Sequence, residues 1–216
     1  MKNEKPVSIS VIRRLPRYYR FLGDLLSRGV ARISSKELAH LMKVTASQIR
    51  QDLNCFGGFG QQGYGYNVEL LHREIGEILG IKNETPTILI GAGNLGKTVA
   101  KRINLKERGF HLIGAFDVDP ALVGTQLTEL TIRDTSELDE FCATHHPKAA
   151  VICIPKEAAA QLADKLVSLG IIGFWNFSSY DFTYSYDNVA CVNMHLGDSL
   201  MTLSYMVSHI EEEAKQ

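Results

Sequence analysis

Apolar residues recur at intervals of three and four positions near the start of the chain, which is the spacing of one buried helix face. From Ile12 to Ser27, this spacing predicts a helix that ends at Gly29. Two shorter helices follow, with expected inward faces of Leu38, Ala39, Leu41 and Met42 in the first, and of Ile49 and Leu53 in the second. Because the two short helices are separated by only a few residues, the pattern predicts a helix-turn-helix.

Capping residues indicate where the two short helices begin. Ser34 with Glu37, and Thr45 with Gln48, each fit a capping box, in which two residues three positions apart satisfy the first N–H groups of a helix. In a helix-turn-helix, the second helix enters the major groove of DNA with its first residues toward the bases. We expect the helix from Thr45 to Asn54 to have this role. The alternative is an ordinary helical hairpin with a solvated face.

A glycine-rich segment follows, with the sequence FGGFGQQGYGYNV from Phe56 to Val68. Glycines allow tight turns and close backbone approach, and aromatic residues anchor the strands of such hairpins. The segment therefore predicts a wing whose tip approaches a minor groove or phosphates. The candidate DNA contacts of the helices and the wing are Arg14, Arg17, Lys43, Thr45, Ser47, Gln48, Arg50, Gln51, Gln61, Gln62 and Tyr64.

A second kind of pattern begins with an apolar strand from Thr87 to Ile90. The strand runs directly into a GxGxxG motif at Gly91, Gly93 and Gly96 and then into a helix. In dinucleotide-binding proteins, these glycines permit the tight turn, the approach of the pyrophosphate and the packing of the helix on the sheet. The next strand ends at Asp117, about 20 positions further on, where an acidic residue accepts hydrogen bonds from the adenosine ribose. Since Asp117 would repel a 2′-phosphate, the sequence favours NADH and NAD+ over the phosphorylated cofactors.

Further apolar runs and a helical stretch predict that the α/β sheet continues. The runs span Ala149 to Ile154, Ile171 to Phe174 and Val189 to Val192, and the helix spans Lys156 to Leu169. Ligands of open parallel sheets bind at the carboxyl ends of the strands, so residues there are expected on the nicotinamide side. The candidate cofactor contacts are Gly91, Ala92, Gly93, Asn94, Leu95, Gly96, Asp117, Ile154, Pro155, Asn176 and Phe177.

The polar stretch from Lys82 to Pro86 is the expected domain boundary. We predict an α/β protein with a winged helix-turn-helix DNA-binding domain over residues 1–84 and a Rossmann dinucleotide-binding and dimerisation domain over residues 85–216. The last helix, from Leu196 to Glu213, is apolar on more than one face and either buries on its own domain or docks on a partner chain. Because winged helices usually bind operators symmetrically, we expect a homodimer.

Charge is divided unevenly along the chain. Up to Val68 there are 11 Lys and Arg against 4 Asp and Glu, a formal charge of +7, whereas the remaining 12 basic and 20 acidic residues give −8. This asymmetry indicates an anionic partner such as DNA for the first domain, with a solvated basic face as the alternative.

Cysteine usage and hydropathy indicate the compartment. The four cysteines are scattered without a CxxC pair, which fits a reducing cytoplasm. Cys142 lies near His145 and His146, but these are more simply surface residues at a helix end, and we expect no metal. No run of about 18 apolar residues occurs, so we expect no contact with a membrane.

No catalytic residue is expected. A dehydrogenase normally needs a substrate domain and a general acid or base beside the nicotinamide, and the second domain has room only for the Rossmann unit. The alternatives are a small NAD-dependent oxidoreductase with an accessory basic domain, and a domain that binds another nucleotide or CoA, since a Rossmann-like fold does not itself determine the ligand.

From Arg14 to Ser204, the chain resembles the Rex family of redox-sensing repressors. The resemblance rests on the joint occurrence of RLPRYYRFL, SSKELA, VTASQIRQDL, FGGFGQQGYGYNV, GAGNLG, FDVD, IPKEAA and WNF. It implies a homodimer with a C-terminal helix swapped between the partner's two domains, bound to an inverted-repeat operator. It also implies a repressor that senses the NADH/NAD+ ratio: NADH releases the DNA, NAD+ permits or favours binding, and the target genes serve fermentation and NADH reoxidation.

Two positions depart from the family pattern. Family members typically have a Tyr at the position of Arg102 and an Asp at that of Asn193, which pair with an Arg matching Arg20 in a redox-dependent network. Only the Arg is retained here. Because Asn cannot be an ionised partner, the resemblance implies a switch among Arg20, Arg102 and Asn193 that differs in detail from that of the family.

Overall fold

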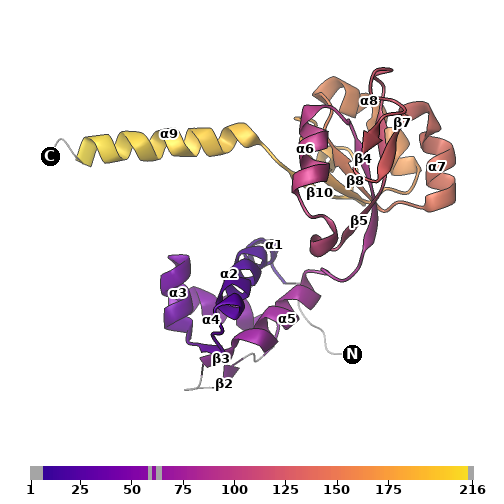
Figure 1. Cartoon of the computed structure of the whole chain (residues 1–216). Helices are drawn as coiled ribbons and strands as arrows, with labels where there is room; N and C mark the ends of the chain where they lie inside the picture. Colours follow the sequence, from indigo (N-terminus) through magenta and orange to yellow (C-terminus); the bar gives the residue numbers. More distant parts are fainter. Residues whose placement is uncertain (1–6, 58–59, 62–64, 214–216) are drawn as a thin grey trace. The chain divides into compact units, whose positions relative to one another are not determined.

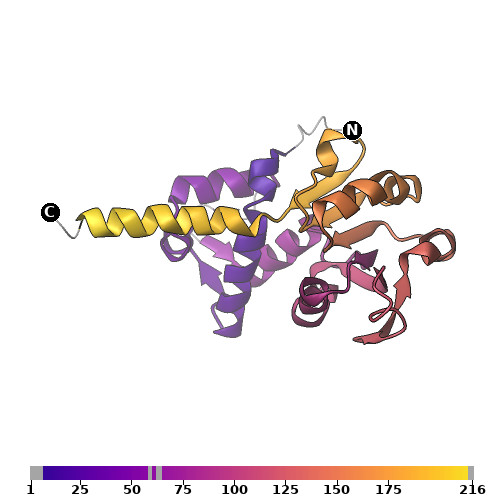
Figure 2. The same cartoon turned by 90° about the horizontal axis from the view of Figure 1, so that it is seen from above.

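The structure is a computed structural model, and it describes residues 7–57, 60–61 and 65–213. The chain divides into two compact units, Met1–Lys82 and Asn83–Gln216. Figures 1 and 2 show the elements of both units in two views, coloured along the sequence from indigo to yellow.

The first unit combines helices with a small antiparallel sheet (Figure 1). Its helices are α1 (Ile9–Ile12), α2 (Leu15–Ser27), α3 (Ser35–Met42), α4 (Ala46–Asn54) and α5 (Val68–Ile78), and its strands are β1 (Arg32–Ile33), β2 (Gly60–Gln61) and β3 (Gly65–Asn67). The strands pair in the order β1-β3-β2. Helices α3 and α4 form the predicted helix-turn-helix, and β2 and β3 form the strands of the wing.

One apolar cluster holds the first unit together. Leu15, Tyr18 and Leu22 recur on one side of α2 and are buried, because this spacing places them on a single helix face. They pack against Ile49 of α4 and Leu71 of α5 among others. The cluster therefore fixes the two helices of the helix-turn-helix against α2 and α5.

Two predictions for this unit need correction. The sequence predicted one helix from Ile12 to Ser27, but Ile12 is the last residue of α1 and a second helix, α2, begins at Leu15. Pro16 lies in the first turn of α2, where the missing N–H of proline costs no helical hydrogen bond. Leu41, expected on the inward face of α3, is 42% exposed.

The second unit is built on a sheet of seven strands in the order β10-β9-β8-β4-β5-β7-β6. All neighbours are parallel except β6 and β7. The strands are β4 (Thr85–Ile90), β5 (Phe110–Asp117), β6 (Gln126–Leu127), β7 (Leu130–Asp134), β8 (Ala149–Ile152), β9 (Gly173–Asn176) and β10 (Ala190–Asn193). The helices are α6 (Asn94–Arg102), α7 (Leu138–His145), α8 (Lys156–Ser168) and α9 (Leu196–Glu213), with 3-10 turns η1 (Lys106–Arg108), η2 (Thr135–Glu137) and η3 (Phe182–Tyr184).

Side chains of this sheet alternate between two apolar layers, because successive residues of a strand point to opposite faces. Ile88 and Ile90 of β4 pack with Leu138 of α7 and Leu166 of α8. Leu89, which lies between them, packs on the other face, in the layer that includes residues of α6. The sheet therefore lies between α7 and α8 on one face and α6 on the other, as in a Rossmann fold (Figure 1).

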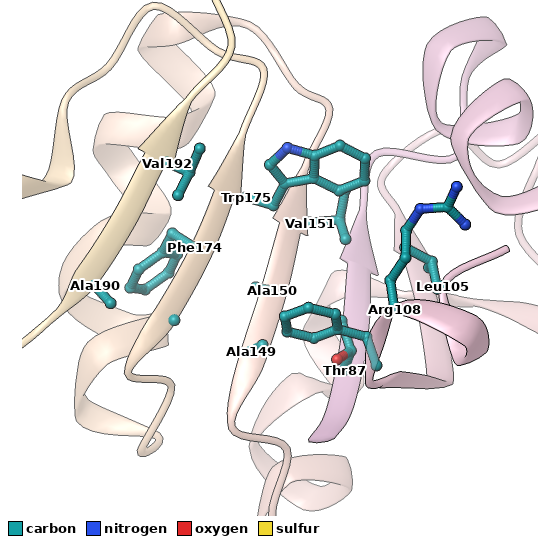
Figure 3. A pocket seen from close by; sticks show the side chains of 12 residues that line it. Thr87, Leu105, Arg108, Ala149, Ala150, Val151, Phe174, Trp175, Ala190 and Val192 are labelled. Atoms are coloured by element: carbon teal, nitrogen blue, oxygen red, sulfur yellow. The ribbon is translucent and has the colours of Figure 1, made fainter. Parts of the chain in front are cut away.

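The α6 face of the sheet is hollow over β8, β9 and β10. Trp175 lies in register with Val151 of β8 and Val192 of β10. Figure 3 shows these side chains across three neighbouring strands, and with Thr87 and Phe110 they help to line a cavity of about 330 Å³. Apolar surface of this extent inside a doubly wound fold indicates that a covering element is missing from this face.

Helix α9 has the predicted bounds, but none of its residues is buried within the described chain. Its exposed large apolar residues are Leu196, Leu200, Met201, Leu203, Tyr205, Met206, Val207 and Ile210. A helix with so many apolar residues gains most of its stability from packing, and among the described residues no such packing buries α9.

One strand lies two residues later than predicted. Ile171 was expected to open β9, but the strand begins at Gly173. Instead, Gly170 adopts a left-handed conformation (φ 90°) after α8, and the N–H of Ile171 donates to the carbonyl of Leu166. Ile171 is therefore buried as the apolar residue of a helix cap, which accounts for its hydrophobicity without a strand.

Candidate functional sites

The turn of the helix-turn-helix is short and well capped. Lys43 ends α3 in a left-handed conformation (φ 52°). At the other end of α3, Ser34 and Glu37 form the predicted capping box. The backbone N–H of Ser34 donates to the Glu37 carboxylate and holds the pKa of that group below its usual value.

The first turn of α4 presents several of the predicted DNA contacts. The hydroxyl of Thr45 accepts a hydrogen bond from the backbone N–H of Gln48 at 3.1 Å. The Gln48 side chain, however, donates to Asp52 instead of returning to Thr45, so the second predicted capping box is only half formed. Ser47 and Gln51 are exposed on the same helix.

Asp52 of α4 is a buried carboxylate that the sequence analysis missed. It is 1% exposed and accepts hydrogen bonds from Arg14 Nε and Nη2 at 2.7 Å, Tyr18 Oη at 2.7 Å and Gln48 Nε2 at 2.8 Å. Burial by itself would raise the pKa of Asp52, but the hydrogen bonds outweigh it and hold the pKa below its usual value. The available signal was an acidic residue directly before Leu53 on the inward face of the helix.

Two other predicted DNA contacts have partners within the first unit. Arg17 Nη2 donates to the carbonyl of Met42 at 2.5 Å, and Arg50 Nη1 donates to Ser35 Oγ at 3.1 Å. Both bonds join a basic side chain to α3. The arginines that were expected at DNA therefore also brace the helix-turn-helix.

The wing is described only in part. Gln61 lies in β2, whereas Gln62 and Tyr64, both expected at DNA, lie outside the described residues. Gly65 begins β3 with a φ of 70°, and a Cβ there would lie 2.6 Å from the carbonyl oxygen of Ile33. Only glycine therefore fits where the wing packs against β1.

The predicted dinucleotide turn links β4 to α6. Gly91 has a φ of 92°, and a Cβ on it would lie 2.6 Å from the carbonyl oxygen of Cys153. A Cβ on Gly96 would lie 1.9 Å from the carbonyl oxygen of Gly91. By contrast, a Cβ on Gly93 would meet no heavy atom of the described residues within 4 Å. Gly91 and Gly96 are thus required by packing, whereas Gly93 leaves space at the start of α6.

The surroundings of Gly93 suit a phosphate. Gly93 is the N-cap of α6, and no side chain of the described residues caps this helix start. The N–H groups of the first turn, together with the helix dipole, therefore face the space above Gly93 and favour an anion. Asn94 and Leu95 are exposed beside it, and Ala92 is fully buried.

Asp117 ties the glycine turn to the end of β5. Its Oδ2 accepts from the backbone N–H of Ala92 at 2.6 Å, and its Oδ1 accepts from those of Val118 and Asp119 at 2.8 and 3.0 Å. The carboxylate lies at the carboxyl end of the strand next to β4, which is where a Rossmann fold holds the adenosine ribose.

The predicted nicotinamide-side residues lie at the carboxyl ends of β8 and β9. Ile154 reaches toward Gly91, with its Cγ2 2.6 Å from a Cβ built on that glycine, and Pro155 precedes α8. Phe177 follows β9 and lies edge-on to Trp175, with 4.8 Å between ring centroids.

Asn176 is committed to protein contacts. It is fully buried, and its Nδ2 donates to the carbonyl of Tyr180 at 2.5 Å and to Asn193 Oδ1 at 2.8 Å. Its Oδ1 accepts from the backbone N–H and the hydroxyl of Ser178. The structure therefore brings Asn176 together with Asn193, a pairing that the sequence analysis missed because it depends on the register of β9 and β10.

The remaining switch residues belong to different units. Arg20 is exposed on α2, with its guanidinium 5.9 Å from the centre of the Phe21 ring. Arg102 is exposed at the end of α6, and Asn193 ends β10.

Within the described ranges, no three His, Cys, Asp or Glu side chains gather as metal ligands. In the same ranges, no helix has the length and hydropathy needed to cross a membrane.

Two family models match the chain. One, described as "Putative DNA-binding protein N-terminus", matches residues 6–54, and the other, "CoA binding domain", matches residues 82–180. The two matches fall on the two units described above.

Proteins called redox-sensing transcriptional repressor Rex are similar over almost the whole chain. That of Caldanaerobacter subterraneus subsp. tengcongensis is 50% identical over 213 residues, which cover 99% of this chain and 94% of the relative. That of Clostridioides difficile strain 630 is 47% identical over 207 residues, which cover 96% of this chain and 98% of the relative.

Solved structures of RSP, a Rex-family repressor, have the same fold. RSP in complex with β-NADH superposes with a TM-score of 0.89 and 45% identity, covering 98% of this chain and 99% of RSP. RSP in complex with β-NAD+ and operator DNA superposes with a TM-score of 0.88 and 48% identity, covering 98% of this chain and 97% of RSP.

Proposed function

Since the chain belongs to the Rex family of redox-sensing transcriptional repressors, we propose that it binds inverted-repeat operators and that NADH releases it from them. NAD+ permits or favours DNA binding, and the regulated genes serve fermentation and NADH reoxidation. The protein acts in the cytoplasm. The observation that supports this most is the glycine turn held by Asp117 in the same chain as a helix-turn-helix. Because the family comprises repressors, the alternative of a small oxidoreductase has no support.

The cofactor lies across the carboxyl ends of the parallel strands. Its pyrophosphate sits above Gly93 at the start of α6, with Ala92, Asn94 and Leu95 around it. Asp117 binds the adenosine ribose. The nicotinamide lies near Ile154-Pro155 and Phe177. Asn176 holds the chain at this end of the site in place through its hydrogen bonds to Ser178 and Asn193.

The operator is bound by residues 1–84. Thr45, Ser47, Gln48, Arg50 and Gln51 face the major groove from α4. Lys43, Arg14 and Arg17 supply positive charge beside it, and the wing residues Gln61, Gln62 and Tyr64 approach the backbone or the minor groove. The positive charge of this part of the chain, +7 up to Val68, favours the approach to DNA.

The functional protein is a homodimer formed by residues 85–216. Helix α9 of each chain covers the hollow sheet face of its partner, where Trp175 and Val192 are uncovered in one chain. Two features support this: α9 has unpartnered apolar residues, and the cavity on the sheet is apolar. A C2 pair would use the same two surfaces reciprocally.

The redox response is a change in the relative arrangement of the two DNA-binding domains. NADH stabilises a state whose α4 helices are wrongly spaced for successive major grooves, which lie about 34 Å apart. Arg20, Arg102 and Asn193 contribute to the switch between states. To move most molecules from one state to the other, the cofactor must bind the two states with affinities that differ by a few kcal/mol.

Calorimetric titration with NADH, NAD+, NADPH and CoA tests the cofactor assignment. We expect NADH and NAD+ to bind and NADPH to bind at least about tenfold more weakly, a difference of about 1.4 kcal/mol, because Asp117 repels its 2′-phosphate. In an Asp117→Asn variant, the gap between NADH and NADPH should narrow. Tighter binding of CoA than of NADH, or equal binding of NADPH and NADH, would contradict the proposal.

A further inference from the structure

The carboxylate of Asp52 can only accept hydrogen bonds while it is ionised. It accepts four hydrogen bonds, from Arg14, Tyr18 and Gln48, and these together hold its pKa below the usual value despite burial. At neutral pH, any amide beside it must therefore turn an N–H toward it. A carbonyl oxygen in that position would face a negative charge at hydrogen-bond distance.

Gln48 is the amide beside Asp52. Its Nε2 donates to Asp52 Oδ1 at 2.8 Å, so its Oε1 and its second N–H point elsewhere. Gln48 is the third residue of α4, in the turn that a helix-turn-helix directs at DNA, and its side chain is half-buried. One end of the amide is thus held by the protein, while an adjacent acceptor and donor remain for a ligand.

Adenine matches this remaining pair of groups. In the major groove, its N6 amino group donates and its N7 accepts, whereas guanine offers two acceptors at O6 and N7. An unrestrained glutamine can rotate its amide to suit either base. Gln48 cannot do so without turning its Oε1 toward the Asp52 carboxylate.

We propose that Asp52 is a positioning residue that fixes the Gln48 amide so that Gln48 selects adenine at one base pair of each operator half-site. This inference rests on the proposed function as a DNA-binding repressor. Asp52 itself does not touch DNA. Its side chain is held in place by the paired bonds from Arg14 and by Tyr18, which anchor it to α2.

The hydrogen bonds of Asp52 allow Gln48 to be replaced without leaving a buried carboxylate unsatisfied. Without the Gln48 side chain, Asp52 still accepts three hydrogen bonds from Arg14 and Tyr18 and remains satisfied. Gln48→Ala should therefore fold normally. Asp52→Asn keeps the shape but presents either an oxygen or an amino group to Gln48, so it frees the amide to rotate.

Selection from duplexes with randomised half-sites, followed by affinity measurements on single-base variants, tests the inference. We expect wild-type protein to prefer A·T over G·C about tenfold or more at one position of each half-site. In Gln48→Ala and in Asp52→Asn, the preference at that same position should fall to within about twofold, with preferences elsewhere kept. Asn54→Ala, at the exposed end of α4, is the matched control and should keep all preferences.

The outcomes separate this inference from the proposed function. Uniform weakening on every sequence in both variants would mean a structural role alone and would overturn the inference, as would unchanged base preferences. Should Asp52→Asn not fold, as judged by cooperative unfolding and NADH binding, Gln48→Ala still tests whether Gln48 is the source of the preference, and an unchanged preference in that variant would overturn the inference. If wild-type protein bound no duplex more tightly than random DNA, the proposed function would fail as well.

Discussion

The glycines of the turn after β4 have different physical reasons to be glycine. Gly91 and Gly96 approach backbone carbonyl oxygens so closely that no side chain fits, whereas the space above Gly93 is open. Gly91 and Gly96 are therefore needed for the fold, whereas packing does not require a glycine at position 93, where we propose that the cofactor binds. A single substitution at each of two positions separates the two roles.

Gly96→Ala should lower the free energy of unfolding of the second unit by at least about 3 kcal/mol, because its Cβ would overlap the carbonyl oxygen of Gly91. Gly93→Ala should lower it by no more than about 1 kcal/mol, since only a helix-cap preference is lost. It should nevertheless weaken NADH binding at least about tenfold, because the added methyl occupies the place of the pyrophosphate. Urea unfolding and calorimetry measure the two effects, and NADH binding by Gly93→Ala at wild-type strength would contradict the assignment.

Asp52 should make the first unit sensitive to acid. Its pKa is lowered in the folded state, so its stabilising effect is complete above the unfolded value of about 3.9 and is lost as the pH falls through the folded value. Asp52→Asn should thus cost about 2 kcal/mol at pH 7 and less at a pH well below about 3.9. Urea unfolding of both proteins at the two pH values measures this, and an equal difference at both would contradict it.

Single residues were predicted from the sequence only where a motif defines their role. The spacing of the glycines and Asp117 reflects local backbone geometry, so it indicated the tight turn after β4 and an acidic residue beside it, which the structure contains. The hydrogen-bond partners of Asp52 and Asn176 could not be predicted, because they lie 38 and 17 positions away and are brought together by packing. Polar residues within apolar patterns are where such networks should be sought.

Elements in which apolar residues recur at regular intervals were predicted well. Short elements, whose formation depends on packing against neighbouring elements, were predicted poorly. The bounds of α9 were correct because apolar spacing and the charged tail mark both ends. Strands β6 and β7 were not predicted because they are short, and only the end of helix α7 near His145 and His146 was anticipated, since α7 has three buried residues. The break between α1 and α2 depends on Pro16, which suits a first turn as well as a bend.

Helix α9 should determine the oligomeric state. Leu200→Glu combined with Met206→Glu places two charges on its apolar surface. Because these carboxylates would lose their hydration when α9 docks on a partner chain, the dimer should dissociate to monomers. Glu212→Gln on the same helix is the control and should stay dimeric. Sedimentation velocity measures the change, and a wild-type monomer or an unaffected double variant would contradict the role of α9.

At the scale of the whole molecule, the sequence indicated two parts with opposite charge, and the structure divides into two units. The charge difference matters because the proposed DNA contacts all lie in the basic part. Operator affinity should therefore fall steeply with salt, whereas NADH affinity should change much less. Titrations at about 50 and 200 mM salt compare the two, and equal salt dependence would contradict this division.

Redox sensing can be tested directly by titrating an inverted-repeat operator with the protein under saturating NADH and under saturating NAD+, with binding followed by fluorescence anisotropy. We predict that NADH weakens operator binding at least about tenfold, a coupling of about 1.4 kcal/mol, and that NAD+ does not weaken it. The Gly93→Ala variant should bind the operator, and it should stay bound at the NADH concentration that releases the wild-type protein. Operator affinity that is the same with both cofactors bound, or release by NAD+ as effective as release by NADH, would contradict redox sensing by this protein.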